Sequence, residues 1–145
     1  MSDYKDITWV NGCFDVLHRG HFELFKHAST LGGAVVVGID SDRRISSAKG
    51  KTRPINVAKD RRFALESIKY IDKVEIFDTD IELAKLISSY CPIHLVVGED
   101  WKDKTVIGCE FARNTHFFKK INSYSTTNII KALGTKKKEN NLWEF

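Results

Sequence analysis

The chain has 145 residues, of which 42% are apolar and 29% are charged, and its formal net charge is +4. This length and apolar content fit one globular domain with a sizeable core. The modest charge does not demand nucleic-acid binding, because a small polyanionic substrate explains it equally well. No run approaches the ~20 apolar residues of a membrane span, and the polar first residues lack the apolar segment of a signal peptide. We therefore expect a cytoplasmic protein that binds neither membranes nor nucleic acid.

The chain contains three cysteines, Cys13, Cys91 and Cys109, which are widely spaced and form no C-x-x-C pair. An odd number with such spacing is typical of free thiols in a reducing compartment. Cys13 lies in a predicted turn, where we interpret it as a small side chain that fills space rather than as a reactive thiol.

The most informative stretch runs from Ile7 to His21 and predicts a buried strand, a tight turn and the start of a helix. Apolar, β-prone residues end at Asn11 and Gly12, which form a turn signal, and helical spacing follows. His18 and His21 are three positions apart, so both imidazoles project from one side of the helix start. Backbone N–H groups lack partners there and the helix dipole favours anions, which predicts a phosphate site.

The local pattern leaves two other interpretations of this cluster open. Asp15 and the two histidines could hold zinc or iron, although three ligands from one short turn would be cramped. Alternatively, one histidine caps or packs and the other is solvated, which is a purely structural role. Gly12 and Gly20 carry no side chain, and this would let a ligand approach the backbone closely.

The rest of the chain alternates between predicted strands and predicted helices. Strands are expected at residues 7–11, 34–39, 73–77, 94–97 and 116–120. Helices are expected at residues 22–31, 58–70, 81–89 and 129–133, the last of them ending at Gly134. Residues 43–57 are interpreted as a long basic loop that binds or closes over a ligand, and residues 102–114 as a loop with a short helix at 109–113.

This alternation predicts an α/β fold, because strands that alternate regularly with helices form right-handed crossovers and a parallel sheet. We expect a single-domain Rossmann-like open parallel sheet of about five strands with helices on both faces. The domain would cover residues 1–134, and residues 135–145 would form a basic, polar C-terminal tail.

One motif in the first predicted turn is similar to a known family signature. Gly12-Cys13-Phe14-Asp15-Val16-Leu17-His18-Arg19-Gly20-His21 resembles the G-x-F-D-x-x-H-x-G-H motif of the cytidylyltransferase-like nucleotidyltransferases. That superfamily transfers a nucleotidyl group from a nucleoside triphosphate to a phosphate or a phosphorylated alcohol and releases pyrophosphate. Later stretches resemble further landmarks of the superfamily, in the same order: Lys49-Gly50-x-x-Arg53-Pro54-Ile55-Asn56, Arg61, Gly98-Glu99-Asp100-Trp101 and Ser125-Thr126-Thr127-Asn128-Ile129-Ile130-Lys131.

Two branches of the superfamily compete. The stretches that begin at Lys49 and Ser125 resemble the adenylyltransferase domain of bacterial heptose-phosphate enzymes, which implies ATP and a sugar or polyol phosphate such as heptose 1-phosphate. The stretch from Gly98 to Trp101 resembles glycerol-3-phosphate cytidylyltransferase, which implies CTP. That branch carries R-T-E-x-I-S-T before its last helix, whereas residues 120–126 here lack the arginine, so we favour ATP. A non-catalytic nucleotide-binding module is a third interpretation, and the intact histidines argue against it.

The resemblance also implies roles for individual residues. His18, His21, Lys49 and Arg61 would be catalytic, by contacting the phosphates and stabilising charge that develops on them. Mg²⁺ would accompany the nucleoside triphosphate, with Asp15 either holding it through water or fixing the turn, and the protein would have no metal site of its own. Relatives are commonly homodimers, a state that the sequence itself does not specify. The implied nucleotide contacts are Gly12, Cys13, Phe14, Asp15, Gly20, Gly98, Asp100, Trp101, Ser125 and Thr126.

Overall fold

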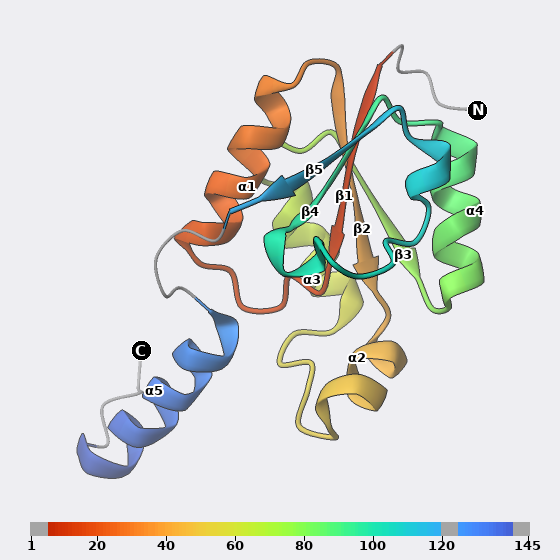
Figure 1. Ribbon diagram of the computed structural model, residues 1–145. Helices are drawn as coiled ribbons and strands as arrows, with labels where there is room; N and C mark the ends of the chain where they lie inside the picture. The colour runs from red at the N-terminus through yellow and green to blue at the C-terminus, as the bar shows by residue number, and fades with distance from the viewer. Residues whose placement is uncertain (1–5, 120–124, 141–145) are drawn as a thin grey trace.

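The computed structural model describes residues 6–119 and 125–140, and in the final helix it describes side chains as far as Gly134. A single sheet of five parallel strands forms its centre (Figure 1). This confirms the predicted α/β fold with an open parallel sheet. The strands are β1 (Ile7–Gly12), β2 (Ala34–Asp40), β3 (Lys73–Phe77), β4 (His94–Gly98) and β5 (Asn114–Phe118).

Helices cover both faces of the sheet. Phe25 of the first helix and Leu65 of the third pack in one apolar cluster, while Leu83 and Ile87 of the fourth pack in a second cluster on the opposite face. Figure 1 accordingly shows α1 and α4 on opposite sides of the strands. The helices are α1 (Arg19–Thr30), α2 (Asp42–Lys49), α3 (Ala58–Glu66), α4 (Asp80–Tyr90) and α5 (Thr126–Asn140), with short 3-10 helices η1 (Glu99–Trp101) and η2 (Cys109–Phe111).

The strand order is β3-β2-β1-β4-β5. The chain winds outward from β1 to β3 and then returns to the other side of β1 for β4 and β5, so the direction of winding reverses between β1 and β4. Because all strands are parallel, their carboxyl ends lie at one edge of the sheet. In open α/β sheets, ligands bind in the crevice at this reversal point, outside the carboxyl ends of the strands.

The two central strands carry most of the core. Trp9 and Val10 of β1 are completely buried, as are Val36 and Val37 of β2, and each such side chain contributes roughly 1.5–3 kcal/mol relative to an exposed one. The indole of Trp9 lies across β2, where a Cβ on Gly38 would come within 2.5 Å of the ring. The central strands therefore leave room for a tryptophan only because position 38 has no side chain.

The structure corrects the prediction of an irregular loop over residues 43–57, because α2 occupies its first part. The Ser41 side chain accepts a hydrogen bond from the Arg44 amide at 3.1 Å and caps the helix start. Ile45 is buried and anchors the helix, and Gly50 with a φ of 101° ends it. Ile45 is the only large apolar side chain among its eight residues, so little apolar area holds the helix and it depends on its caps and on tertiary contacts.

Other boundaries also differ from the prediction. Helix α3 ends at Glu66 rather than at residue 70. Just after Glu66, the Ser67 hydroxyl donates a hydrogen bond back to the Phe63 carbonyl. Helix α5 begins earlier than predicted and continues through Gly134 to Asn140, because one glycine costs only about 1 kcal/mol in a helix and good helix formers follow it. The predicted division between a domain and a C-terminal tail stays a prediction.

The last strand and the connections near it also differ in part from the prediction. Strand β5 lies two residues before its predicted position, since its register is set by pairing of Asn114 with His94. The predicted short helix at 109–113 is present as η2, whereas η1 was not predicted. Residue 120 of the predicted strand, the segment to residue 124 and the end of the tail lie outside the described residues. No helix in the described part of the chain combines the length and the apolar character that crossing a bilayer requires.

Candidate active site

The loop after β1 makes a sharp turn that prepares the start of α1. Phe14 adopts a φ of 48°, in the left-handed region that residues other than glycine rarely occupy. Its ring folds back over Gly12, where a Cβ would lie 3.0 Å from Phe14 Cζ. The same ring contacts the rings of His21 and Phe25 edge-on, with centroids 5.4 and 5.0 Å apart. Gly12 and Phe14 therefore act together as packing partners that hold the first turn of α1 in place.

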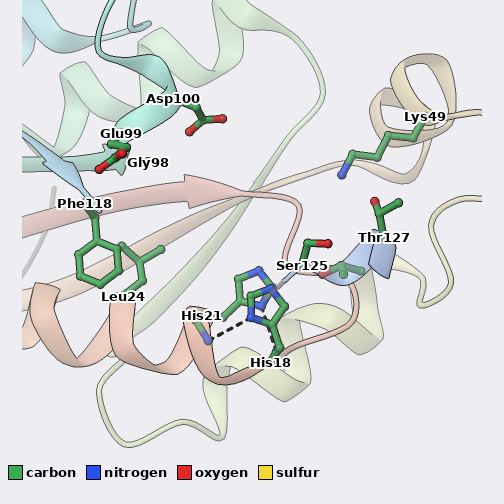
Figure 2. Close-up of a pocket in the computed structure, with 12 residues that line it drawn as sticks. His18, His21, Leu24, Lys49, Gly98, Glu99, Asp100, Phe118, Ser125 and Thr127 are labelled. Atoms are coloured by element: carbon green, nitrogen blue, oxygen red, sulfur yellow. Dashed lines mark hydrogen bonds between the residues drawn. The ribbon is translucent and has the colours of Figure 1, made fainter. Parts of the chain in front are cut away.

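His18 and His21 form a reciprocal cap at the start of α1. His18 Nδ1 accepts a hydrogen bond from the Gly20 amide at 3.0 Å, and His21 Nδ1 accepts one from the His18 amide at 3.2 Å. The two rings are stacked, with centroids 3.8 Å apart and planes 25° from parallel. Figure 2 shows both imidazoles side by side at the helix start. The structural role considered for these histidines is thus real, and the cap uses Nδ1 of each ring.

This arrangement fixes the tautomer of both rings. A backbone amide can only donate, so each Nδ1 must act as an acceptor and the ring hydrogen must reside on Nε2. Both side chains line a pocket, so the helix start presents two imidazole N–H donors at its edge. Protonation of either Nδ1 would set two donors against each other and break the cap. The geometry therefore requires both rings to be neutral.

Electrostatics favour the neutral form of His21 as well. Burial lowers the pKa of His21 from 6.5 to about 4, and the neighbouring His18 and the cation of Lys49 act in the same direction. The imidazole is therefore uncharged at neutral pH and acts as a hydrogen-bond donor rather than as a cation.

The pocket beside these histidines has a volume of about 520 Å³ and lies at the carboxyl edge of the sheet. Segments from several parts of the chain meet there. The start of α1 contributes the histidines and Gly20, and Leu24 and Phe118 supply an apolar wall (Figure 2). The lining also includes Lys49 from the end of α2, residues 98–100 after β4, and residues 125–127 at the start of α5.

The start of α5 is joined directly to the loop after β1. The Thr126 hydroxyl donates to the Val16 carbonyl at 2.7 Å, and the Ser125 hydroxyl accepts from the Asn128 amide at 3.0 Å. Two helix starts with hydroxyl groups and imidazole N–H groups thus converge on one cavity. Such convergence suits a ligand with several negative charges.

A second pocket of about 440 Å³ adjoins the first, with Lys49, Gly98 and Asp100 lining both. It extends over the carboxyl ends of β1 and β2, where Gly12, Cys13 and Asp40 lie. The cleft therefore has two compartments that meet at a lysine and a carboxylate. We call them the histidine compartment, which is the pocket lined by His18 and His21, and the tryptophan compartment, which is the pocket lined by Trp101.

Comparison with known proteins decides the family. The profile of the cytidylyltransferase-like family matches residues 9–132, which is most of the chain. The chain belongs to the cytidylyltransferase-like family. This confirms the resemblance seen in the sequence and the prediction of a nucleotidyltransferase.

Relatives agree with this family assignment. The chain is 43% identical over 131 residues to the bifunctional protein HldE of Helicobacter pylori (strain ATCC 700392 / 26695), covering 90% of this chain and 28% of that protein. It is 41% identical over 126 residues to the bifunctional protein HldE of Campylobacter fetus subsp. fetus (strain 82-40), covering 87% and 27%. The chain therefore spans little more than a quarter of the length of these relatives.

Solved structures match the fold at lower identity. A lipopolysaccharide core biosynthesis protein from Thermoplasma volcanium superposes with a TM-score of 0.61 at 22% identity, covering 83% of this chain and 98% of that chain. Pantothenate synthetase from Thermus thermophilus gives 0.63 at 14% identity, covering 92% and 64%. At these identities the likeness concerns the fold alone, and it agrees with the predicted Rossmann-like architecture.

In this member of the cytidylyltransferase-like family, Asp15 fixes the loop after α2. Its carboxylate accepts hydrogen bonds from the amides of Ile55 and Asn56 at 2.6 and 2.8 Å, and it lies 3.5 Å from Arg53 Nε. Of the two roles considered for Asp15, the geometry favours the structural one, because both carboxylate oxygens already accept backbone hydrogen bonds. Among the described residues, no group of three or more His, Cys, Asp or Glu side chains could hold a metal ion.

Arg61 lies away from the pocket, in contrast to the phosphate contact that the resemblance implied. Its side chain is fully buried and donates to the carbonyls of Asn56 and Cys13 and to the carboxylate of Asp42, each at 2.9 Å. All three nitrogens of the guanidinium are therefore committed to the protein. Arg61 joins α2, α3 and the loop after β1, and so supports the segment that carries Lys49.

Phe14, a predicted nucleotide contact, lines neither compartment, because its ring packs on Gly12, His21 and Phe25. The predicted residues other than Phe14, Asp15 and Arg61 each line one compartment or both. Cys13 lines the tryptophan compartment, where burial and the nearby carboxylate of Asp40 raise the pKa of its thiol, consistent with a packing role. Trp101 lines this compartment too, rather than the one with the histidines.

Four residues of the histidine compartment were not predicted from the sequence: Leu24, Glu99, Phe118 and Thr127. Glu99 and Thr127 each belong to a stretch that the resemblance had identified, so adjacency to chosen residues was an available signal. Leu24 and Phe118 carried no such signal, because an apolar residue on a helix or strand is usually interpreted as part of the core.

Proposed function

We propose that this nucleotidyltransferase transfers a nucleoside monophosphate, preferably from ATP, to the phosphate of a sugar or polyol phosphate such as heptose 1-phosphate. The observation that carries the proposal is the pair of Nε2–H donors at the start of α1, which line the same cavity as Lys49 and the start of α5. This cavity suits a triphosphate, and its apolar wall of Leu24 and Phe118 suits a nucleobase.

In the proposed reaction, an oxygen of the acceptor phosphate attacks the α-phosphorus of the triphosphate, and the bond from that phosphorus to the departing pyrophosphate breaks. The protein supplies no nucleophile and acts through positioning and charge stabilisation. His18 and His21 donate hydrogen bonds where negative charge develops on the phosphates, and Lys49 neutralises charge at the junction of the two compartments. Ser125 and Thr126 bring the second helix start to the phosphates.

Mg²⁺ would arrive with the triphosphate and offset the charge of its oxygens. Magnesium in nucleotide enzymes is typically held by one or two carboxylates together with substrate phosphates. Asp100 fits this role, because its carboxylate belongs to a residue that lines both compartments. Asp15 does not fit it, since its oxygens accept backbone amides.

ATP and a sugar phosphate are favoured by two lines of support. The stretches from Lys49 to Asn56 and from Ser125 to Lys131 resemble bacterial heptose-phosphate adenylyltransferase domains. The relatives at 43% and 41% identity are bifunctional HldE proteins, and this chain corresponds to only part of them. Glycerol-3-phosphate cytidylyltransferase is the second candidate, which the stretch from Gly98 to Trp101 favours. The homodimer and the cytoplasmic location stay predictions.

A substrate matrix tests this proposal. Each of ATP, CTP, GTP and UTP would be combined with heptose 1-phosphate, glycerol 3-phosphate and choline phosphate, with pyrophosphate release as the readout and mass spectrometry to identify the product. We expect the highest rate with ATP and heptose 1-phosphate. A preference for CTP and glycerol 3-phosphate would support the second candidate instead. Tight nucleotide binding without pyrophosphate release from any pair would indicate a non-catalytic module.

A further inference from the structure

The tryptophan compartment differs from the histidine compartment in its chemistry. The described residues that line it place no imidazole there, and they include two carboxylates, Asp40 and Asp100. Asp40 is paired with Arg44 at 2.7 Å, and Arg44 is also paired with Asp80 at 2.7 Å. Arg44 and Lys49 also line the compartment, so its two carboxylates face two cations before any ligand enters. A polyanion is therefore better accommodated beside the histidines, and uncharged polar groups are better accommodated here.

Asn11 at the end of β1 offers this compartment a hydrogen-bond donor of fixed orientation. Its Oδ1 accepts a hydrogen bond from Trp9 Nε1 at 3.1 Å. The indole of Trp9 is completely buried and its nitrogen can only donate, so the amide oxygen must face the indole. The amide nitrogen then occupies the other branch of the side chain. Since Asn11 lines the compartment, its NH₂ group is the part available to a ligand.

Apolar groups complete the lining. Trp101 is 44% exposed and lines the compartment together with Val106 and Ile107. A ligand that matches these surroundings has C–H faces for the apolar side chains and hydroxyl groups for the carboxylates and the amide. Sugars and other polyols combine these features, because each carbon carries both a C–H and a hydroxyl group. Lys49 at the boundary supplies the positive charge that a phosphate on such a ligand requires.

We infer that the tryptophan compartment is the acceptor subsite and that it takes a polyhydroxylated sugar phosphate, with the phosphate at Lys49 and the hydroxyl groups at Asn11 and Asp40. This inference rests on the proposed function and deepens it by assigning the acceptor to one compartment and its recognition to named side chains. It makes Asn11 a specificity-determining residue, whose NH₂ group donates to an acceptor hydroxyl. A short acceptor such as glycerol 3-phosphate would fill less of the compartment and gain less from these contacts.

The substitution Asn11→Asp tests the inference sharply. An aspartate keeps an oxygen toward the Trp9 indole and replaces the NH₂ donor with an oxygen that only accepts. We expect the KM for heptose 1-phosphate to rise about tenfold or more, as the loss of one such hydrogen bond predicts, with the KM for the nucleotide within about twofold of the wild type. Trp101→Leu should raise the same acceptor KM without changing the Asn11 contact. The matched control is Leu24→Ala, which should raise the nucleotide KM and leave the acceptor KM unchanged.

Calorimetry separates this inference from the proposed function, because binding requires no turnover. We expect the wild type to bind heptose 1-phosphate in the presence of a non-hydrolysable ATP analogue, and Asn11→Asp to bind it about tenfold more weakly. This result would support the acceptor subsite even if no pyrophosphate were released from any substrate pair. The inference is overturned if the wild type binds no sugar phosphate, or if Asn11→Asp and Trp101→Leu weaken nucleotide binding and leave sugar-phosphate binding intact.

Discussion

The reciprocal cap at the start of α1 predicts that its two duties can be separated by substitution at His18. One ring nitrogen holds the helix start, and in the proposed function the hydrogen on the other nitrogen is donated to the substrate. Asparagine places an oxygen near the position of Nδ1 and is itself a preferred N-cap residue, but its side chain ends before the position of Nε2. Glutamine reaches the position of Nε2 and fits the cap poorly. The substitutions His18→Asn and His18→Gln should therefore have opposite effects on stability and on rate.

The magnitudes follow from what each variant keeps. His18→Asn retains the acceptor for the Gly20 amide, so the free energy of unfolding should stay within about 0.5 kcal/mol of the wild type. Its rate should fall about 100- to 1000-fold, as is typical when a donor to the transition state is removed. His18→Gln should lose about 1 kcal/mol of stability through the missing cap and should remain faster than His18→Asn.

The assay combines urea unfolding with kcat/KM from pyrophosphate release, measured on the same protein preparations. Unfolding gives the capping contribution, and turnover gives the contribution of the donor. If His18→Asn kept its rate within about threefold of the wild type, the hydrogen on Nε2 could not be stabilising the transition state. If His18→Asn were instead strongly destabilised, the interpretation of the ring as a cap would be wrong.

Three further predictions concern stability. Burial above all holds the pKa of His21 at about 4, below its usual 6.5, so the unfolded chain binds a proton before the folded protein does as the pH falls. In urea titrations the free energy of unfolding should therefore be full above pH 6.5 and decrease by about 3 kcal/mol down to pH 4, and His21→Asn should flatten this dependence. Arg61→Met should lower the free energy of unfolding, measured by thermal unfolding, by about 3 kcal/mol, because two carbonyls and a carboxylate lose their donor. The control Arg62→Met removes a half-exposed ion pair and should lower it by under about 1 kcal/mol. Gly38→Ala should lower the free energy of unfolding by about 1–3 kcal/mol, because the added Cβ would meet the buried indole of Trp9 at 2.5 Å. Gly134→Ala, which has open space around it, should be neutral or stabilising. Equal effects of the two substitutions would contradict this packing argument.

Much of the fold could be predicted because its strands and helices carry their own periodicity. The unbroken apolar run of Ala34–Ile39 corresponds to a strand whose residues are buried on both faces. Helix α4 begins at a capping threonine, Thr79, and shows apolar residues at helical spacing. The two histidines at the start of α1 were predicted from spacing alone, since residues three positions apart at a helix start point the same way.

The missed features depend on contacts between distant parts of the chain. Helix α2 is tied to α3 by Asp42, which accepts hydrogen bonds from the Ala58 amide at 2.8 Å and from Arg61 at 2.9 Å. No local pattern reveals such a network, and a charged residue such as Arg61 in a polar helix is normally expected at the surface. The compartments of the cleft are equally non-local, because Leu24 and Phe118 meet only when β5 takes its place beside β4.

The hydrogen bond from Thr126 to Val16 joins residues that are 110 positions apart. The first loop of the sheet and the last described helix thus close the same cavity. During synthesis, which proceeds from the amino end, all five strands leave the ribosome before this cavity is complete. A nucleotide should therefore make its full set of contacts only with chains whose translation has passed α5. Shorter nascent chains should bind nucleotides weakly.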